Sequence, residues 1–544
     1  MILAKYKLHI ISFLIFLFTF LSFLPTIHDL SLSNKLYDQN REFILEHNYY
    51  WPDFNLYLSK IRQGQEGKLF PKELYSSEPH SGSLIQIFYS ILGMIGKIIG
   101  LDPNFSYQLG RLMLTPILLL VIFLLTTHVF KNSLWQIIGF ITIVVSSSFP
   151  KFTTGEGGQL IVQRYMEWWS NIDSLQRIAF IPHILFGQIV SFLVFYFLLK
   201  KNWIVTSKDI LIYAIVGNIL GLVFPPSLIT LNSVIIIFAI IKIIKTRNLY
   251  PHLYLIFFVL VSLLSQIYIW DLTRQIPWIA LVHVHRINHM LIPFTEYLLA
   301  LGPVVILAFI GIIVSLFQKD KKMTPFILWI VVSFFYSIVF THYKEQSPLR
   351  FTQGGIHIPL GILGYYAIFQ SLKIFPKTII YLFLILYFIE NLFILKLSWD
   401  WQYIFNVARA RANIPPVAYP PQTVHPLKKW MDAMRFLREN TRRDDVIVAE
   451  ISAGNHIPAY AGNTVYFGQV NTYDYDRKYA LVQKFFTGLM TWNEAQVFLR
   501  TGRIRYIFFG PQERERASNK NLAEFYPFLK PVYQNDAVTI YAWY

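Results

Sequence analysis

The chain has 544 residues, of which 54% are hydrophobic and only 15% are charged. This balance is typical of a protein embedded in a membrane, whereas a soluble chain of this length carries more charge. The formal net charge is +17, and the basic residues gather in short loops between apolar runs, so we expect no nucleic-acid partner. The absence of cysteine excludes disulfides, thiolate metal sites and a cysteine nucleophile.

Apolar runs recur along the first three quarters of the chain. The run at 8–24 follows Lys5 and Lys7 and has no small-residue cleavage site behind it, so we expect an uncleaved anchor rather than a signal peptide. A helix needs about 20 apolar residues to cross a bilayer, and on that basis the sequence predicts about eleven spans. The other ten lie at 108–130, 134–149, 180–199, 209–224, 227–242, 253–270, 295–317, 324–341, 356–372 and 378–396.

Lysine and arginine gather in alternate short loops. The positive-inside rule places these basic loops in the cytoplasm, and the longer polar loops then face outward, as does everything after Leu397. The protein is therefore expected in the cytoplasmic membrane with its C-terminal region outside the cytoplasm. The basic loops carry Lys131, Lys200, Lys201, Lys208, Lys242, Lys245, Arg247, Lys319, Lys321, Lys322, Lys373 and Lys377.

Two features bear on this topology. The stretch 83–100 is long enough to cross, but Gln86, Ser90 and Lys97 favour an interfacial helix. The spans carry few ionisable residues, with Glu390 the main exception, and this scarcity argues against an ion-coupled transporter. The chemistry is therefore expected at the outer surface.

The chain is predicted to have three parts. Residues 1–397 form a transmembrane domain whose first outer loop, 28–107, contains interfacial helices. A proline-rich linker at 398–424 leads to a small extracytoplasmic α/β domain at 425–544. The expected fold is thus a polytopic α-helical membrane protein with a C-terminal α/β domain. Its strand-like runs are 446–451, 464–467, 504–509 and 537–543, and the linker carries Pro415, Pro416, Pro420 and Pro421.

The first outer loop contains a short amphipathic pattern next to an acid. Apolar residues at i, i+3, i+4 and i+7 from Phe54 predict a helix that lies flat on the bilayer, with Gly64 as its C-terminal cap. Asp53 stands at its start, where aspartate is a common N-cap. A helix N-terminus keeps a carboxylate ionised, so a capping role and a role toward a substrate hydroxyl are both open. The face opposite the apolar stripe carries Asn55, Ser59, Lys60 and Arg62.

A second polar pattern follows at Glu78-Pro79-His80. The residue before a proline favours extended backbone, and side chains two apart on extended backbone share a face. Glu78 and His80 are therefore predicted to converge on one ligand or metal, with an ordinary polar loop as the alternative.

Together these segments resemble a known superfamily. A first span, an outer-loop acid on a short helix, and then Ile61-Arg62-Gln63-Gly64, Leu74-Tyr75, Glu78-Pro79-His80 and Phe88-Tyr89 look like the GT-C glycosyltransferases, closest to the protein O-mannosyltransferase and lipid A aminoarabinose transferase branch. That branch has an Asp-Glu pair and a Tyr-x-x-Lys-Pro-Pro-type turn. Here Phe54 replaces the second acid, and Glu78-Pro79-His80 replaces the turn.

The resemblance implies an inverting transfer of a sugar from a polyprenyl-phosphate donor to an extracytoplasmic lipid, glycan or protein. It makes Asp53 the base for the acceptor hydroxyl. The leaving phosphate needs positive charge, for which Arg350 is the first choice and Arg177 the second, because guanidinium matches phosphate oxygens. An interfacial arginine that contacts lipid headgroups is the alternative. Glu78, His80 and Asp173 are the other expected substrate-binding residues.

A divalent metal is a further expectation. His285 and His289 are four residues apart and would share a helix face, where Glu78 or Asp173 could complete a site. Hydrogen-bonded loop histidines are the alternative. Two other functions also stay open: a non-enzymatic transporter or flippase for lipid-linked glycan, and a glycan polymerase or ligase that uses a lipid diphosphate donor.

Overall fold

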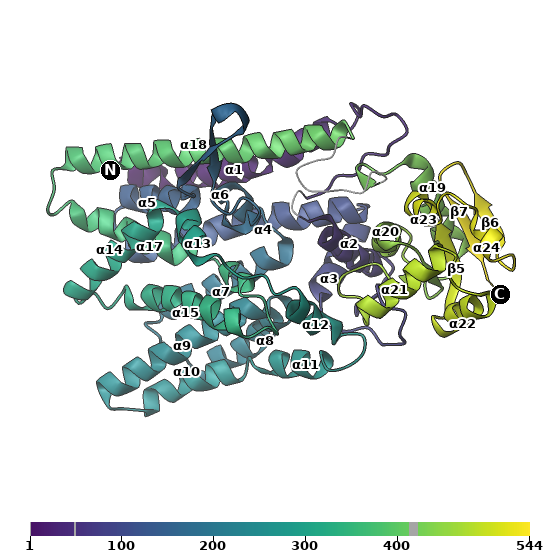
Figure 1. The fold of residues 1–544 in the computed structure, drawn as a ribbon. Helices are drawn as coiled ribbons and strands as arrows, with labels where there is room; N and C mark the ends of the chain where they lie inside the picture. Colours follow the sequence, from purple (N-terminus) through teal and green to yellow (C-terminus); the bar gives the residue numbers. More distant parts are fainter. Residues whose placement is uncertain (1, 48–49, 413–422, 544) are drawn as a thin grey trace. The chain divides into compact units, whose positions relative to one another are not determined.

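The computed structural model describes residues 2–47, 50–412 and 423–543, which form two compact units. We call them the membrane unit (Met1–Leu24, Leu109–Ile269 and Asn288–Trp401) and the α/β unit (Pro25–Gln108, Trp270–Ile287 and Gln402–Tyr544). Residues 28–107, expected as an outer loop of the transmembrane domain, thus belong to the same unit as the C-terminal region. Figure 1 traces the chain through both units.

Seven helices of the described residues are long and apolar enough to cross a membrane, and the protein is a multi-pass membrane protein. An eighth candidate is a pair of helices, α13 (Phe294–Leu301) and α14 (Pro303–Phe317), which meet at a bend of 87°. The seven are α1 (Ile2–Ser31), α4 (Pro103–Val129), α7 (Pro182–Lys200), α9 (Pro225–Thr246), α10 with α11 (Tyr250–Leu260 and Leu264–Leu272), α15 (Thr324–His342) and α18 (Lys377–Ala410).

The predicted count of about eleven spans is not confirmed. All the predicted segments are helical, but three of the helices, α5 (Ser133–Val145), α8 (Ser207–Val223) and α17 (His357–Ser371), have only 13, 17 and 15 residues. Apolar composition does not distinguish a helix that crosses a bilayer from one that is buried among other helices. The stretch expected to be interfacial forms α3 (Ile87–Ile98), whose 12 residues are fewer than a span needs.

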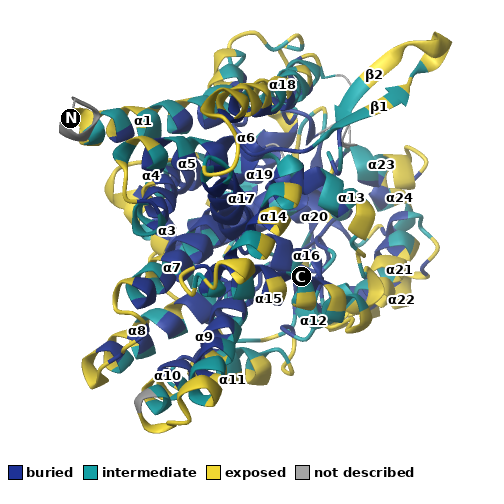
Figure 2. Cartoon of the chain, turned by 90° about the vertical axis from the view of Figure 1, so that its left-hand side faces the viewer, coloured by how far each residue is buried: buried dark blue, intermediate teal, exposed yellow. Residues whose placement is uncertain are grey.

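Helix α17 is buried at the centre of the membrane unit, as the dark blue ribbon in Figure 2 shows. Glycines let its neighbours approach closely. A Cβ placed on Gly311 of α14 would lie 2.1 Å from the carbonyl oxygen of Leu363, and one on Gly139 of α5 would lie 2.7 Å from the ring of Tyr365. Small residues at such contacts are the usual means of packing helices in a membrane.

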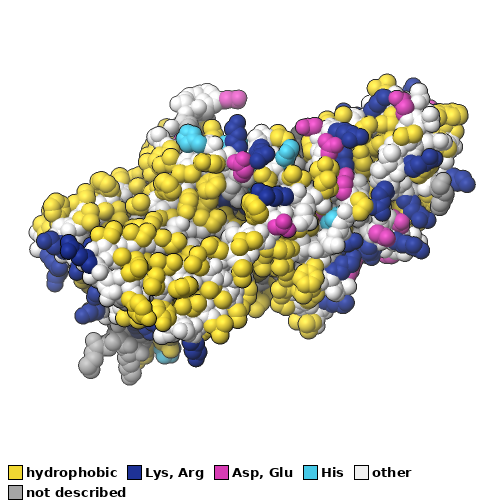
Figure 3. All heavy atoms as spheres, turned by 90° about the horizontal axis from the view of Figure 1, so that it is seen from below, with side chains coloured by type: hydrophobic (Ala, Val, Ile, Leu, Met, Phe, Trp, Pro, Cys, Tyr) yellow, Lys and Arg dark blue, Asp and Glu magenta, His cyan; other side chains and the backbone are white. Residues whose placement is uncertain are grey.

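The outside of the helical bundle is apolar. Figure 3 shows hydrophobic side chains spread over much of the visible face of the membrane unit. An antiparallel hairpin, β1 (Pro150–Thr154) and β2 (Leu160–Arg164), extends from the bundle, and its tip is exposed in Figure 2. Short helices α6 (Ser174–Arg177) and α16 (Leu349–Thr352) follow in the loops of this unit.

The α/β unit contains a five-stranded mixed sheet in the order β4-β3-β5-β7-β6. β3 pairs in parallel with β4 and β5, while β7 is antiparallel to β5 and β6. The strands are β3 (Val446–Val448), β4 (Thr464–Val465), β5 (Ile504–Phe509), β6 (Lys530–Gln534) and β7 (Thr539–Ala542). The helices are α2 (Trp51–Gln65), α3, α12 (Ala280–Ile287), α19 (Lys428–Asn440), α20 (Ile451–Tyr460), α21 (Tyr475–Phe486), α22 (Trp492–Thr501), α23 (Pro511–Arg516) and α24 (Leu522–Phe525).

The four strand-like runs of the sequence all contain a strand, and β6 is additional. The first run was predicted too long, because α20 begins at Ile451. Residues 398–410 of the predicted linker are helical, since α18 continues to Ala410. Its four prolines, Pro415, Pro416, Pro420 and Pro421, lie outside the described residues.

Candidate functional site

The short helix of the first loop begins earlier than predicted. α2 starts at Trp51, and its N-cap is Tyr50, whose backbone is extended and whose side chain makes no cap hydrogen bond. Pro52 lies in the first turn, a position that proline favours because its fixed φ suits the helix and it has no N–H to leave unpaired. The prediction that Asp53 is the N-cap is therefore wrong. Asp53 lies inside the first turn, where the helix dipole still favours its ionised form.

Asp53 is half-buried, so it is neither locked in the core nor fully in solvent. Its surroundings include tyrosine hydroxyls. Burial, followed by the nearby Asp53 carboxylate, raises the pKa of Tyr50 to about 12. A half-buried carboxylate in the first turn of a helix can accept a proton from a hydroxyl.

The polar face of α2 packs against protein rather than facing the bilayer surface. Asn55 Nδ2 donates to Asn455 Oδ1 at 2.8 Å, and Arg62 Nε donates to the Ala459 carbonyl at 2.6 Å, so α20 covers this face. The Pro52 carbonyl, in the first turn of the helix, accepts from Gln469 Nε2 at 2.9 Å. The expectation that α2 lies flat on the membrane is wrong, and Asp53 stands on a helix held from both ends.

Gly64 was predicted as the C-terminal cap of this helix, and this prediction is also wrong. α2 continues through it to Gln65, with Glu66 as C-cap. A Cβ at Gly64 would lie 2.0 Å from the Ser90 carbonyl oxygen, so the glycine permits close contact between α2 and α3.

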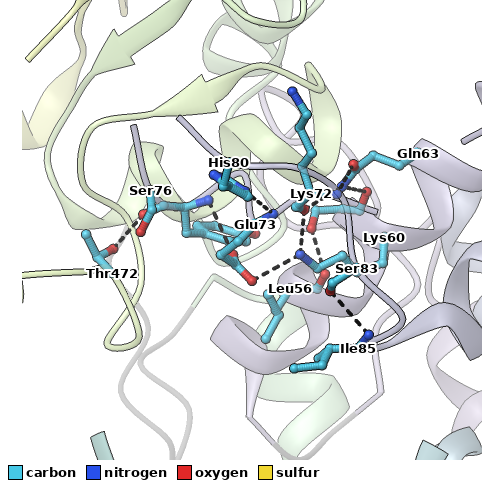
Figure 4. A network of polar contacts seen from close by, with 12 residues as sticks. Leu56, Lys60, Gln63, Lys72, Glu73, Ser76, His80, Ser83, Ile85 and Thr472 are labelled. Carbon is cyan, nitrogen blue, oxygen red and sulfur yellow. Dashed lines mark hydrogen bonds and ion pairs between the residues drawn. The ribbon is translucent and has the colours of Figure 1, made fainter. Parts of the chain in front are cut away.

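A buried ion pair joins α2 to the segment behind it. Lys60 Nζ lies 3.0 Å from Glu73 Oε2, with the two side chains 0% and 4% exposed. Lys60 also donates to the Lys72 carbonyl at 2.7 Å, and Gln63 accepts from the Lys72 N–H at 2.8 Å. Figure 4 shows this network between α2 and the loop. Burial lowers the pKa of Lys60, against the opposing effect of Glu73. The network fixes the loop that carries Glu78 and His80.

His80 serves this network. Its Nε2 accepts from the Glu73 N–H at 2.9 Å, and its Nδ1 is 2.7 Å from the Glu78 carbonyl, which can only accept. The ring is therefore protonated on Nδ1 and has no nitrogen left for a metal. Its edge packs on Trp278 at 5.8 Å between ring centroids.

Glu78 points to a different partner. Its Oε1 lies 2.6 Å from Lys478 Nζ on α21. The predicted convergence of Glu78 and His80 on one ligand is thus wrong, because each side chain is used in holding the loop to the rest of the α/β unit. The other Glu78 oxygen is buried, with no hydrogen-bond partner among the described residues.

The second loop uses its charges internally. Asp173 is the N-cap of α6, accepts from the Leu175 N–H at 2.8 Å and forms an ion pair with Arg164, and its side chain is 4% exposed. The neighbouring cavity has a volume of about 10 Å³, room for about one water. Arg177 is buried and donates to backbone carbonyls at the end of α5, including Val144 at 3.2 Å.

Arg350 is different. It is half-buried in α16, and among residues 2–47, 50–412 and 423–543 its guanidinium has no hydrogen-bond or ion-pair partner. Arg177 has both terminal nitrogens committed to the protein and only Nε without a partner, whereas Arg350 has no committed guanidinium nitrogen among the described residues.

The predicted histidine pair does not form. α12 ends at Ile287, so His285 lies within the helix and His289 beyond it, where its Nε2 is 3.1 Å from the Thr341 carbonyl oxygen. Within the described part of the chain, no three His, Asp or Glu side chains are placed to hold a metal ion. The donor set for the expected metal is therefore not assembled here.

Lys60, Glu73 and Trp278 were not predicted as part of this region. Lys60 was expected to face away from the apolar stripe, and Glu73 follows it by thirteen residues, a spacing with no helical or strand period. Trp278 comes from a distant segment, and Lys60 Nζ lies 6.0 Å from its ring centroid. Nothing local in the sequence could have brought the three together.

Comparison with known proteins supports the fold. No protein-family model matches the chain, and no curated protein matches it. The structure is similar to the archaeal oligosaccharyltransferase AglB from Archaeoglobus fulgidus, solved with an inhibitory peptide and a dolichol-phosphate, at a TM-score of 0.52 and 11% identity over 96% of this chain and 74% of that one. It is also similar to arabinofuranosyltransferase AftD from Mycobacteria, at a TM-score of 0.54 and 12% identity over 96% and 41%.

ArnT from Cupriavidus metallidurans, bound to undecaprenyl phosphate, has a TM-score of 0.49 and 11% identity over 98% of both chains. AglB and AftD are GT-C membrane glycosyltransferases. The fold of this chain is therefore the GT-C fold, and the resemblance found in the sequence is confirmed at that level.

Proposed function

We propose that this protein transfers a sugar from a polyprenyl-phosphate donor to a hydroxyl acceptor outside the cytoplasm, with Asp53 as the base. The observation that carries the proposal is a half-buried carboxylate in the first turn of a helix that is held rigidly, within a GT-C fold. The AglB structure was solved with a dolichol-phosphate, which supports a lipid-phosphate donor for this chain too.

In this reaction the acceptor oxygen attacks the anomeric carbon and the bond from that carbon to the phosphate oxygen breaks. The acceptor proton passes to the Asp53 carboxylate, and the polyprenyl phosphate leaves with the bonding electrons. Attack from the side opposite the leaving group inverts the anomeric centre. A positioned base of this kind contributes roughly 10²–10⁴-fold to the rate.

For the phosphate we propose Arg350. The support for this role is its own environment: a half-buried guanidinium on a short helix, without a protein partner in the described residues. Guanidinium binds phosphate oxygens through two parallel hydrogen bonds and stays charged at any physiological pH.

The test uses the full chain in proteoliposomes with a panel of radiolabelled polyprenyl-phosphate sugars. The wild type should release polyprenyl phosphate and move the label to an acceptor. Asp53→Asn should reduce this release at least about 100-fold without altering the melting temperature. Asp444→Asn changes an exposed acid in the turn before β3 and should have no effect.

Three results would contradict the proposal. Full turnover by Asp53→Asn would remove that residue from the mechanism. Binding of lipid-linked sugar by the wild type without any covalent product would favour the transporter alternative. A leaving lipid that carries pyrophosphate would favour the polymerase or ligase.

A further inference from the structure

The α/β unit contains a cavity that the proposed transfer reaction does not use. Its volume is about 270 Å³, just below the ~300 Å³ at which small-molecule sites begin. The walls come from the last turn of α1, the segment 42–45, the start of α4, one face of α19, and the side chains of Arg62 and Tyr460. Asp53 is not among the lining residues.

The cavity has an excess of positive charge. Three arginines line it, Arg62, Arg435 and Arg438, against the two acids Glu42 and Asp102. Glu42 is already paired with Arg435 at 2.9 Å, and Asp102 accepts the N–H of Phe105 at the start of α4. Both acids are thus occupied by other contacts. Two of the arginines also have acidic partners, since Arg435 pairs with Asp432 at 2.7 Å and Arg438 with Glu439 at 3.0 Å, so Arg62 is the arginine without an ion pair in the described residues.

Arg62 has unused donors. Its Nε donates to the Ala459 carbonyl, but its two terminal nitrogens have no hydrogen-bond partner in the described part of the chain. Burial, with Arg438 and Arg443 adding to it and Glu66 opposing it, lowers the pKa of Arg62 to about 10. The guanidinium remains charged at neutral pH, and an anion beside it would relieve the repulsion among the arginines.

The rest of the wall is apolar and lies where lipid is expected. Met431 and Met434 of α19 line it together with Phe43 and Phe105. Leu30 is in the last turn of the span formed by α1, and Pro103 begins the span formed by α4, so the cavity lies at the ends of two membrane-crossing helices. Methionine and aromatic side chains adapt to flexible hydrocarbon.

From these observations we propose that the cavity is a binding site for a phosphate-bearing lipid, separate from the site proposed at Asp53. Arg62 and Arg438 would contact the phosphate oxygens, and the apolar wall would contact the first carbons of the chain. An uncharged sugar would not compensate the charge of Arg62, and an apolar molecule would also leave its terminal nitrogens without a hydrogen-bond acceptor. A phosphate with a hydrocarbon tail would pair its oxygens with the arginines and pack its carbons against the apolar side chains.

The experiment is native mass spectrometry of the full-length protein in dodecyl maltoside. Four probes are titrated: dihexanoyl phosphatidylglycerol, farnesyl phosphate, the zwitterionic dihexanoyl phosphatidylcholine, and inorganic phosphate. Phosphatidylglycerol, farnesyl phosphate or both should occupy one site that depends on Arg438, in addition to any farnesyl phosphate bound at the proposed donor site, and the lipid that binds this Arg438-dependent site tighter identifies the natural source. Arg438 is 38% exposed, so Arg438→Gln should fold normally and weaken this binding about tenfold or more.

A second variant and a control accompany it. Met434→Trp fills the apolar side of the cavity and should also abolish lipid binding. Arg500→Gln removes an exposed arginine of α22, which does not line the cavity, and should bind as the wild type does. Equal loss in all three variants, equal binding of phosphatidylcholine, or inorganic phosphate that binds as tightly as the lipids would overturn the proposal. Sugar transfer is not part of this readout, so failure here leaves the proposed function untouched.

Discussion

The segments 51–80 and 164–177 both contain polar and charged residues, yet they use them differently. In 164–177 the charges of Asp173 and Arg177 face partners in the membrane unit and are buried. In 51–80 the buried pair Lys60–Glu73 plays the same structural role, but Asp53 stays half-buried on a rigid helix. A charged residue that keeps part of its surface exposed is thus a better candidate for chemistry than one that is fully buried.

The largest expected effect is the loss of stability when the buried ion pair in the segment 51–80 is broken. Lys60→Met leaves Glu73 buried without its ion-pair partner and should destabilise the α/β unit by ~3–5 kcal/mol. This loss of stability is measured by chemical unfolding, with hydrogen exchange in α2 as the probe. The double variant Lys60→Met, Glu73→Leu should recover most of the loss. If the single variant were as stable as the wild type, the pair would not hold the loop.

In the segment 164–177, replacing Arg177 should lower the stability of the protein. Arg177→Gln removes donors from the carbonyls at the end of α5 and should cost at least ~1–3 kcal/mol. Thermal unfolding in detergent is the measurement. A variant that melts at the wild-type temperature and fails only in sugar transfer would show that Arg177 acts on substrate.

Arg350 can be compared directly with Arg177, because the sequence predicted that either arginine could bind the leaving phosphate. Arg350→Gln removes no hydrogen bond or ion pair among the described residues, so its melting temperature should not change. Turnover should fall about 10- to 100-fold if the guanidinium holds the leaving phosphate. The Michaelis constant for the lipid donor and the rate constant are measured separately. Unchanged turnover would leave Arg350 as a residue that contacts lipid headgroups.

The smallest expected effect concerns pH and a buried acid elsewhere in the α/β unit. Burial raises the pKa of Glu513 from its usual 4.5 to about 8, against the hydrogen bond that the Glu450 backbone N–H donates to it, while the charge of the Glu450 carboxylate adds to the rise. The folded state therefore binds more protons than the unfolded state between these values, so stability is complete below pH 4.5 and is lost as the pH rises through about 8.

Hydrogen exchange in β3 and β5 at pH 6, 7 and 8 measures this slope. Glu513→Gln should flatten it whatever its absolute stability, whereas Glu515→Gln on the same short helix should not. A slope that is unchanged in Glu513→Gln would show that this carboxyl does not titrate in the range.

Part of the candidate site was predictable. The apolar period after Asp53 predicted α2, and the acid at its start stays the proposed base. The predicted cap and the predicted surface position were wrong, because the helix begins at Trp51, with Pro52 in its first turn, and Asn455 of α20, four hundred residues away, covers the polar face.

The sequence by itself determined which segments are helical or extended and that the chain is built for a membrane, because these properties depend on neighbours a few residues apart. The tertiary structure decided which apolar helices are long enough to cross the membrane. It also decided which charged side chains have partners within the protein. Those outcomes depend on partners brought from far along the chain, as Lys478 is to Glu78. A buried polar group needs a hydrogen-bond partner in the folded protein. Because that partner can come from any part of the chain, the pairing leaves no periodic pattern in the sequence.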